Sequence, residues 1–258
     1  MSRTCLIGHT GFVGTNLKQQ RPFDDLYRST DIEEIRGKHY DLMVCSGVSA
    51  AKWRANQAPE EDRAAIDRLL HNLSAVHADR VILISTVDVY PVARKVDESF
   101  DCASLPNHAY GANRLYVENA LREKFPNLTI VRLPALFGPG LKKNVIYDLL
   151  HNNCLNVINP DSLFQYYDMT SISRDLDTIL ERQLPVVNLA TEPVATKLIH
   201  HRFFPDTSIG SDPAPAAAYD IRSRHAGIFG QSNGYRFSAD EVLSRLGAYI
   251  DSERRNTA

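Results

Sequence analysis

The segment "IGHTGFVG", residues 7–14, places Gly8, Gly11 and Gly14 between an apolar run and a helix-like segment. A tight strand-to-helix turn needs a residue that tolerates positive φ, which is the role expected for Gly8. Gly11 would let the backbone approach a pyrophosphate, and Gly14 would let the helix pack on the strand. N–H groups at the helix N-terminus would then bind the phosphates. The segment predicts a dinucleotide-binding loop; a glycine-rich turn without a ligand is the alternative.

The first half of the chain alternates between apolar runs and segments with helical spacing. Strands are predicted at 4–8, 24–29, 40–47, 80–86 and 128–138, and helices at 11–20, 59–78 and 108–125. The runs at 40–47 and 80–86 are continuously apolar, as in strands covered on both faces. This order predicts an α/β fold with a doubly wound parallel sheet.

The pattern loosens after about residue 140. Helices are predicted at 144–152, 171–184 and 238–253, and a late strand at 185–190. Ser238 and Glu241 have the spacing of a capping box before the last helix. We predict a dinucleotide-binding domain at 1–140 and a small C-terminal substrate lobe with returning sheet elements at 141–258, as one integrated unit.

Composition excludes several classes of function. The 258 residues carry a formal net charge of −2, which gives no bulk attraction to nucleic acid or membrane. The four Cys have scattered spacing without a CxxC pair, so no metal site is expected. Cys5 and Cys45 lie inside apolar runs and are predicted to be small buried hydrophobes. No apolar run is long enough to span a membrane, so we expect a soluble, cytoplasmic protein.

Two further segments follow in order, "LISTVDVYP" (83–91) and "HAYGANRLYVE" (108–118). Together with the GxxGxxG spacing of the first loop, they resemble the extended short-chain dehydrogenase/reductase superfamily, the NAD-dependent epimerase/dehydratase family, over about residues 3–195. The resemblance implies a Rossmann sheet, an NAD or NADP cofactor and a small-molecule substrate. It also suggests a homodimer, because helices equivalent to 59–78 and 108–125 pair between subunits in many relatives.

The resemblance assigns the catalytic roles to Thr86, Tyr110 and Arg114. Thr86 would hold the substrate oxygen, and Tyr110 would act as general acid/base. A free Tyr has a pKa of about 10, and a fixed cation nearby lowers it. The family uses Lys one helical turn after the Tyr, whereas this chain has Arg114. Arg carries the same charge but essentially never deprotonates, so we expect either slower chemistry or a cofactor site with altered function.

The cofactor site is predicted to include more than the glycines. Arg28 and Ser29 follow the second strand, where an acid would favour NAD; Arg28 could instead pair with a 2′-phosphate, which favours NADP. A solvated Arg at a strand end is the alternative. The remaining predicted cofactor contacts are Thr10, Phe12, Val13, Ser46, Gly47, Val48, Ser85, Pro134 and Leu136.

Substrate contacts are predicted in four segments of the chain. They are Ser49, Lys52, Trp53, Asp88, Tyr90, Asn144 and Gln165. Gln165 or Phe164 stands where the family usually has an Arg that binds a sugar-nucleotide pyrophosphate, which weakens the assignment of a sugar nucleotide.

The sequence therefore predicts an NAD(P)-dependent oxidoreductase or epimerase/dehydratase that acts on a sugar-like hydroxyl or carbonyl by hydride transfer. The rival is a dinucleotide-binding sensor or assembly partner of the same fold. Loss of the Lys favours the rival, and retention of Thr86 and Tyr110 favours catalysis.

Overall fold

The computed structural model describes residues 3–257, which divide into two compact units. Unit 1 comprises the chain up to Pro91 together with Ser99–Arg132 and Ser171–Val187. Unit 2 comprises Val92–Glu98, Leu133–Thr170 and the chain from Asn188 onward. The domain boundary at residue 140 stays a prediction. Within the described residues, no helix has both the length and the apolar character needed to cross a bilayer.

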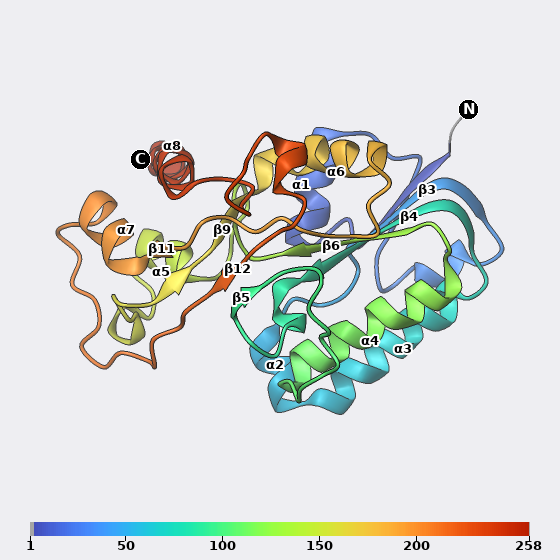
Figure 1. Cartoon of the computed structure of the whole chain (residues 1–258), viewed down its shortest axis with the longest axis horizontal. Coiled ribbons are helices and arrows are strands. Elements are labelled where there is room, and N and C mark those ends of the chain that lie inside the picture. The colour runs from blue at the N-terminus through green and yellow to red at the C-terminus, as the bar shows by residue number, and fades with distance from the viewer. Residues whose placement is uncertain (1–2, 258) are drawn as a thin grey trace. The chain divides into compact units, whose positions relative to one another are not determined.

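Unit 1 is built on a six-stranded sheet (Figure 1). Its strands are β1 (Thr4–Ile7), β2 (Asp25–Tyr27), β3 (His39–Cys45), β4 (His77–Thr86), β6 (Leu128–Leu133) and β10 (Val186–Asn188). The spatial order is β10-β6-β4-β3-β1-β2, and β1 pairs in parallel with both β2 and β3. The strand order reverses at β1, so the carboxyl ends of β1 and β3 form a topological switch point. The predicted doubly wound, Rossmann-like sheet is confirmed.

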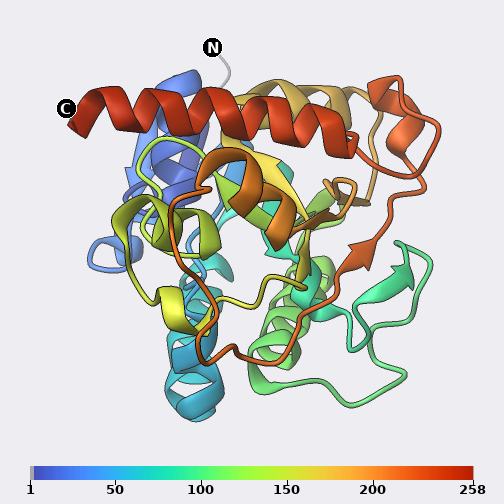
Figure 2. The same ribbon diagram turned by 90° about the vertical axis from the view of Figure 1, so that its left-hand side faces the viewer.

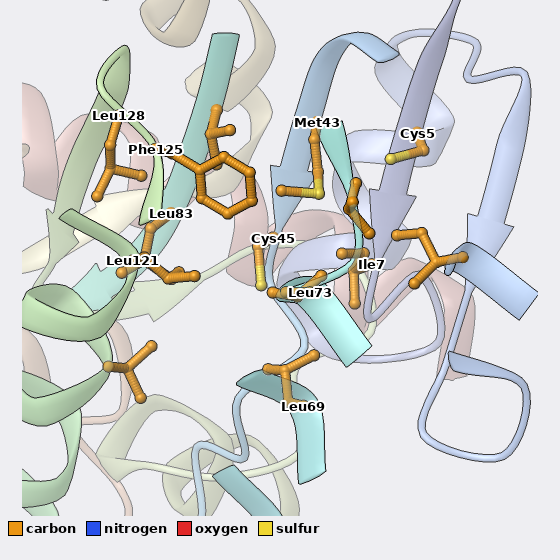
Figure 3. Close-up of a cluster of buried hydrophobic side chains, with 14 of the residues drawn as sticks. Cys5, Ile7, Met43, Cys45, Leu69, Leu73, Leu83, Leu121, Phe125 and Leu128 are labelled. Atoms are coloured by element: carbon orange, nitrogen blue, oxygen red, sulfur yellow. The ribbon is translucent and has the colours of Figure 1, made fainter. Parts of the chain in front are cut away.

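Helices cover both faces of this sheet. α1 (Phe12–Gln20) and α6 (Ile172–Glu181) lie on one face, and α3 (Pro59–Leu73) and α4 (Ala109–Lys124) on the other (Figure 1). The short α2 (Lys52–Gln57) precedes α3. Apolar side chains of α3 and α4 pack on the sheet in a buried cluster (Figure 3). Cys5 and Cys45 belong to this cluster and are fully buried, as predicted.

The largest differences between predicted and observed elements are at two places. The helix predicted at 59–78 ends at Leu73, because His77 already pairs with His39 of β3 and starts β4. The strand predicted at 128–138 is divided into β6 and β7 (Ala135–Phe137) by Pro134. Proline has no N–H to donate to a strand ladder, which favours the break.

Unit 2 contains three small two-stranded sheets, β11-β8, β12-β5 and β7-β9. The further strands are β5 (Arg94–Val96), β8 (Leu163–Phe164), β9 (Tyr166–Asp168), β11 (Val194–Ala195) and β12 (Asp220–Ile221). Its helices are α5 (Val145–His151), α7 (Thr196–Phe203) and the long α8 (Ala239–Thr257; Figure 2). The predicted capping box is confirmed: the Ser238 N–H donates to Glu241 Oε2 at 2.8 Å, and the Glu241 N–H to Ser238 Oγ at 3.3 Å.

Five single-turn 3-10 helices complete the described chain. They are η1 (Ile32–Ile35), η2 (Val87–Val89), η3 (Leu155–Val157), η4 (Met169–Ser171) and η5 (Ala226–Phe229).

Candidate active site

Two of the three loop glycines are required by the chain itself. Gly8 has φ +83°, and a Cβ there would lie 2.5 Å from the Ser46 carbonyl oxygen. A Cβ on Gly14 would lie 2.2 Å from the Gly8 carbonyl oxygen. Both distances are too short for carbon and oxygen, so the turn and the approach of α1 to β1 both depend on glycine.

Gly11 is different, because none of the described residues lies close enough to exclude a side chain there. Its φ is −75°, and a Cβ there would meet its nearest neighbour, Gly8 O, at 3.4 Å. Gly11 is exposed and precedes α1, whose first turn receives no side-chain cap. An exposed, uncapped helix N-terminus without a Cβ fits a pyrophosphate. Within the part of the chain described, the buried His9 Nδ1 in this loop also has no hydrogen-bond partner. The residues present therefore fit a dinucleotide.

The other predicted loop residues lie around the same turn. Thr10 is exposed, and Phe12 and Val13 are half-buried in the first turn of α1. The loop after β3 is tied to β1: Ser46 Oγ donates to the Ile7 carbonyl at 2.9 Å. Gly47 and Val48 continue this loop. Ser46, Gly47 and Val48 thus lie at the switch point with the glycine loop.

Arg28 and Ser29 are exposed just after β2. The Arg28 N–H donates to Asp31 Oδ1 at 2.6 Å, and its Nε lies 3.3 Å from Asp31 Oδ2. Asp31 therefore accepts hydrogen bonds from both the backbone and the guanidinium of Arg28. A 2′-phosphate that binds Arg28 would have to compete with the Asp31 carboxylate for the guanidinium.

Thr86 and Tyr110 are brought together from β4 and α4. Thr86 ends β4, and its Oγ1 accepts from the Asp88 N–H at 3.1 Å. Tyr110 is only 6% exposed. Burial raises the pKa of Tyr110, the positive charge of Arg114 lowers it, and the negative charge of Asp88 raises it. Hydrogen bonds with Arg114 and Thr86 also lower it, but the pKa stays above its ordinary value.

Arg114 faces Tyr110 and is held by a carboxylate that the sequence did not reveal as a site residue. Its guanidinium carbon lies 4.3 Å from the centroid of the Tyr110 ring. Arg114 Nη1 and Nη2 donate to the two oxygens of Asp62 at 2.7 and 2.9 Å, and Nη2 also donates to the Ser49 carbonyl. Burial by itself would raise the pKa of Asp62, but hydrogen bonds from Arg114 and Asn113 outweigh it and lower that pKa.

An ion pair between α2 and η2 flanks Tyr110. Lys52 Nζ lies 2.7 Å from Asp88 Oδ1, and both side chains are partly exposed. His108 stacks near Tyr110, with 6.2 Å between ring centroids. Burial and the charge of Lys52 lower the pKa of His108. Trp53, also on α2, is 67% exposed.

Ser85 and Tyr90 belong to a buried network in unit 1. The Ser85 hydroxyl donates to Glu118 at 2.6 Å, and the Tyr90 hydroxyl accepts from Arg132 at 2.8 Å. Arg132 in turn binds Glu118, which has no exposed surface. The predicted ligand contacts of Ser85 and Tyr90 are not supported by these positions, because the two hydroxyls form hydrogen bonds with Glu118 and Arg132 inside unit 1.

The remaining predicted residues lie in unit 2. Pro134 directly precedes β7, and Leu136 lies within it. Asn144 accepts from the N–H groups of Ile146 and Tyr147 and therefore caps α5. Gln165 is 1% exposed, and its amide binds the backbone of Thr191 and Ile221. The predicted substrate contact of Gln165 is not supported, because its amide is buried and is already hydrogen-bonded to the backbone of unit 2.

Residues 24–160, more than half of the chain, match the model of the NAD dependent epimerase/dehydratase family. The chain belongs to this family. The family comprises NAD-dependent epimerases and dehydratases, which gives the class of cofactor and the general kind of enzyme. Comparison with curated protein sequences gives no match.

Several solved structures share the fold over nearly the whole chain. The UDP-glucose 4-epimerase of Thermotoga maritima, with UDP-glucose, is 12% identical with a TM-score of 0.75 and covers 99% of this chain and 100% of its own. The dTDP-4-dehydrorhamnose reductase of Bacillus anthracis, with NADP, is 13% identical with a TM-score of 0.73, covering 97% and 98%. An NAD-dependent NDP-hexosamine 5,6-dehydratase of tunicamycin biosynthesis is 17% identical with a TM-score of 0.76, covering 98% of both chains. At these identities the similarity shows the fold alone.

Proposed function

We propose that this family member is an NAD(P)-dependent oxidoreductase or epimerase/dehydratase that acts on a sugar-like hydroxyl or carbonyl, free or nucleotide-linked. The observation that carries the proposal is the contact between Thr86 and Tyr110, with Arg114 one turn further along α4. In an unrelated role, nothing would require a strand-end hydroxyl, a buried phenol and a cation to converge.

Each of these side chains has a distinct task in the proposed reaction. Thr86 binds the reacting substrate oxygen and orients it. Tyr110 removes a proton from the hydroxyl in oxidation and returns one to the carbonyl oxygen in reduction. Arg114 stabilises the phenolate form of Tyr110 by its charge.

The glycine loop holds the dinucleotide in this proposal, with the first turn of α1 facing the pyrophosphate. When bound, NAD(P) supplies the nicotinamide ring that accepts or donates hydride. Arg28 supports NADP, since its guanidinium is exposed at the end of β2 and can pair with a phosphate. Asp88 is the acid nearest Thr86 along the chain, and its salt bridge to Lys52 offers dehydration less support than oxidation or epimerisation.

The alternative is a dinucleotide-binding sensor. It is favoured by one observation, the pairing of Arg114 with Asp62, which compensates the charge expected to activate Tyr110. The two functions differ in turnover, so the experiment compares the native protein with Tyr110→Phe.

The test uses NAD⁺ and NADP⁺ with a panel of nucleoside-diphosphate hexoses and free sugars. Nicotinamide absorbance follows net redox, and NMR of the products follows epimerisation and dehydration. We expect Tyr110→Phe to lose at least about 100-fold in turnover, with cofactor affinity retained. Unchanged turnover would exclude Tyr110 as the acid/base. Cofactor binding without turnover across the panel, in both proteins, would favour the sensor.

We also retain the homodimer as a proposal, to be tested by sedimentation of the purified protein. Part of the expected face on α3 and α4 is already covered within the chain. The Arg63 guanidinium lies 3.2 Å from the Tyr116 ring centroid, and the Tyr116 hydroxyl donates to Asp67 at 3.0 Å.

A further inference from the structure

Asp62 and Arg114 form a buried ion pair beside Tyr110, and the proposed reaction gives Asp62 no task. The two side chains are 9% and 5% exposed. Two parallel hydrogen bonds of 2.7 and 2.9 Å join them in the fork geometry that is specific to Arg. A Lys at position 114 could not form this fork, since its ammonium is a single point of contact.

Three separate segments fix the pair in place. Asp62 comes from the first turn of α3 and Arg114 from α4. Asn113 Nδ2, also on α4, donates to Asp62 Oδ2 at 2.9 Å. The Ser49 carbonyl, in the loop after β3, accepts from Arg114 Nη2. The guanidinium therefore has a defined orientation against the Tyr110 ring.

We infer that Asp62 is a positioning residue of this site, which fixes the Arg114 guanidinium on the Tyr110 ring and offsets its charge there. The inference rests on the acid/base role proposed for Tyr110. It explains how the chain accommodates Arg in place of Lys: the bulkier cation is held by a dedicated carboxylate.

The charge on Arg114 reaches Tyr110 only in part while Asp62 is ionised. A cation alone would stabilise the phenolate more strongly than a cation paired with a carboxylate. The pKa of Tyr110 lies above its ordinary value because burial outweighs the lowering effect of Arg114. Asp62 thus controls how far Arg114 can lower it.

Other titratable or polar groups also lie around Tyr110 and influence its pKa, so a test of Asp62 must leave them unchanged. These are Arg114 on α4, His108 at the N-cap of α4, and Asp88 of η2. Lys52 of α2 is bound to Asp88. β4 contributes the neutral hydroxyl of Thr86. A substitution at Asp62 leaves all of them in the chain.

The experiment measures the titration of the Tyr110 phenol in the cofactor-free protein. Tyrosine labelled with ¹³C at Cζ reports ionisation by NMR, and Tyr110 is assigned as the signal missing from Tyr110→Phe. We expect Asp62→Asn to lower the titration midpoint by about 0.5–1 pH unit. Asp62→Glu keeps the charge and should restore a midpoint close to that of the native protein.

Asp67→Asn is the matched control, because Asp67 is on the same helix but is exposed and contacts Tyr116. It should leave the Tyr110 midpoint unchanged. If Asp62→Asn does not fold, Asp62→Ser replaces it with the same expected direction. An unchanged midpoint in a folded neutral variant at position 62 would overturn the inference.

This result is separate from the test of the proposed function. The phenol titration needs neither cofactor nor substrate. It can therefore reject the positioning role of Asp62 even if turnover depends on Tyr110. Conversely, turnover that is indifferent to Tyr110→Phe would reject the proposed function and leave the measured coupling between Asp62 and Tyr110 in place.

Discussion

The Arg132 guanidinium forms two hydrogen bonds with Glu118, at 2.6 and 3.0 Å, where neither side chain exposes more than 5% of its surface. The pair joins β6 to α4, the helix that carries Tyr110. Ser85 donates to Glu118 and Tyr90 accepts from Arg132, so the stretch of chain on both sides of Thr86 is anchored to this pair.

Glu118→Gln should therefore destabilise the protein strongly. It removes the negative charge and leaves the Arg132 cation buried without compensation, which typically costs about 3–5 kcal/mol. Urea unfolding at neutral pH measures the loss. Glu123→Gln, on the exposed side of the same helix, is the control and should change the free energy of unfolding by less than about 0.5 kcal/mol. Equal losses in the two variants would contradict a structural role for the pair.

Substitutions in the glycine loop should separate folding from cofactor binding. The added methyl of Gly11→Ala meets no close contact with residues 3–257, so the melting temperature of this variant should stay near that of the native protein. Its affinity for NADH and NADPH should fall at least about 10-fold, because the added methyl occupies the approach to the pyrophosphate. Gly14→Ala should instead lower the melting temperature, since its methyl would meet the Gly8 carbonyl at 2.2 Å. Thermal unfolding and nicotinamide fluorescence report the two effects, and full affinity in Gly11→Ala would argue against the site.

Arg28 should set the preference between the two cofactors. Arg28→Ala is expected to weaken NADPH binding while NADH binding changes little, because only NADPH carries the 2′-phosphate. Asp31→Asn should strengthen NADPH binding, since it releases the guanidinium from its 3.3 Å contact with Asp31. Fluorescence titration of both cofactors gives the ratio of dissociation constants. A ratio that is the same in all three proteins would make Arg28 a solvated strand-end residue.

Alkaline pH should weaken unit 2 through Tyr235. Burial and the hydrogen bond to Asp220 raise the pKa of Tyr235 to about 12. In the unfolded chain the value is about 10, so above pH 10 the unfolded state loses this proton first. The stabilising contribution is therefore complete below pH 10 and is lost as the pH rises toward 12. Urea unfolding between pH 8 and about 11.5 should show a shallower decline for Tyr235→Phe than for the native protein. Parallel declines would assign the alkaline sensitivity to other groups.

The sequence predicted the sheet, the glycine loop and the meeting of Thr86 with Tyr110, because these depend on local patterns and on one helical turn. It did not predict the partner of Arg114, which lies 52 positions away in the chain. Asp62 falls among three acidic residues at the start of α3, where a carboxylate is already explained by the helix dipole. The only available signal was that a buried Arg needs an anion.

The roles of hydroxyl and amide groups were harder to predict. Ser85 and Gln165 have side chains that suit a ligand and suit a buried network equally well. The choice depends on Glu118 in one case and on the backbone of Thr191 and Ile221 in the other. Such partners come from distant parts of the chain, and no local pattern records them.

The interleaving of the two units has a consequence for synthesis on the ribosome. The edge strand β10, which lies beside β6 in the sheet of unit 1, begins only at Val186, after Leu133–Thr170 of unit 2 have been translated. Before β10 has been made, β6 is the edge strand of the sheet, and its backbone groups on that side have no partner strand. This holds even though the first five strands of the sheet have already been synthesised. Unit 1 therefore cannot be completed until Val92–Glu98 and Leu133–Thr170 of unit 2 have been translated. Because each unit is assembled from separate stretches of the chain, neither corresponds to one continuous gene fragment.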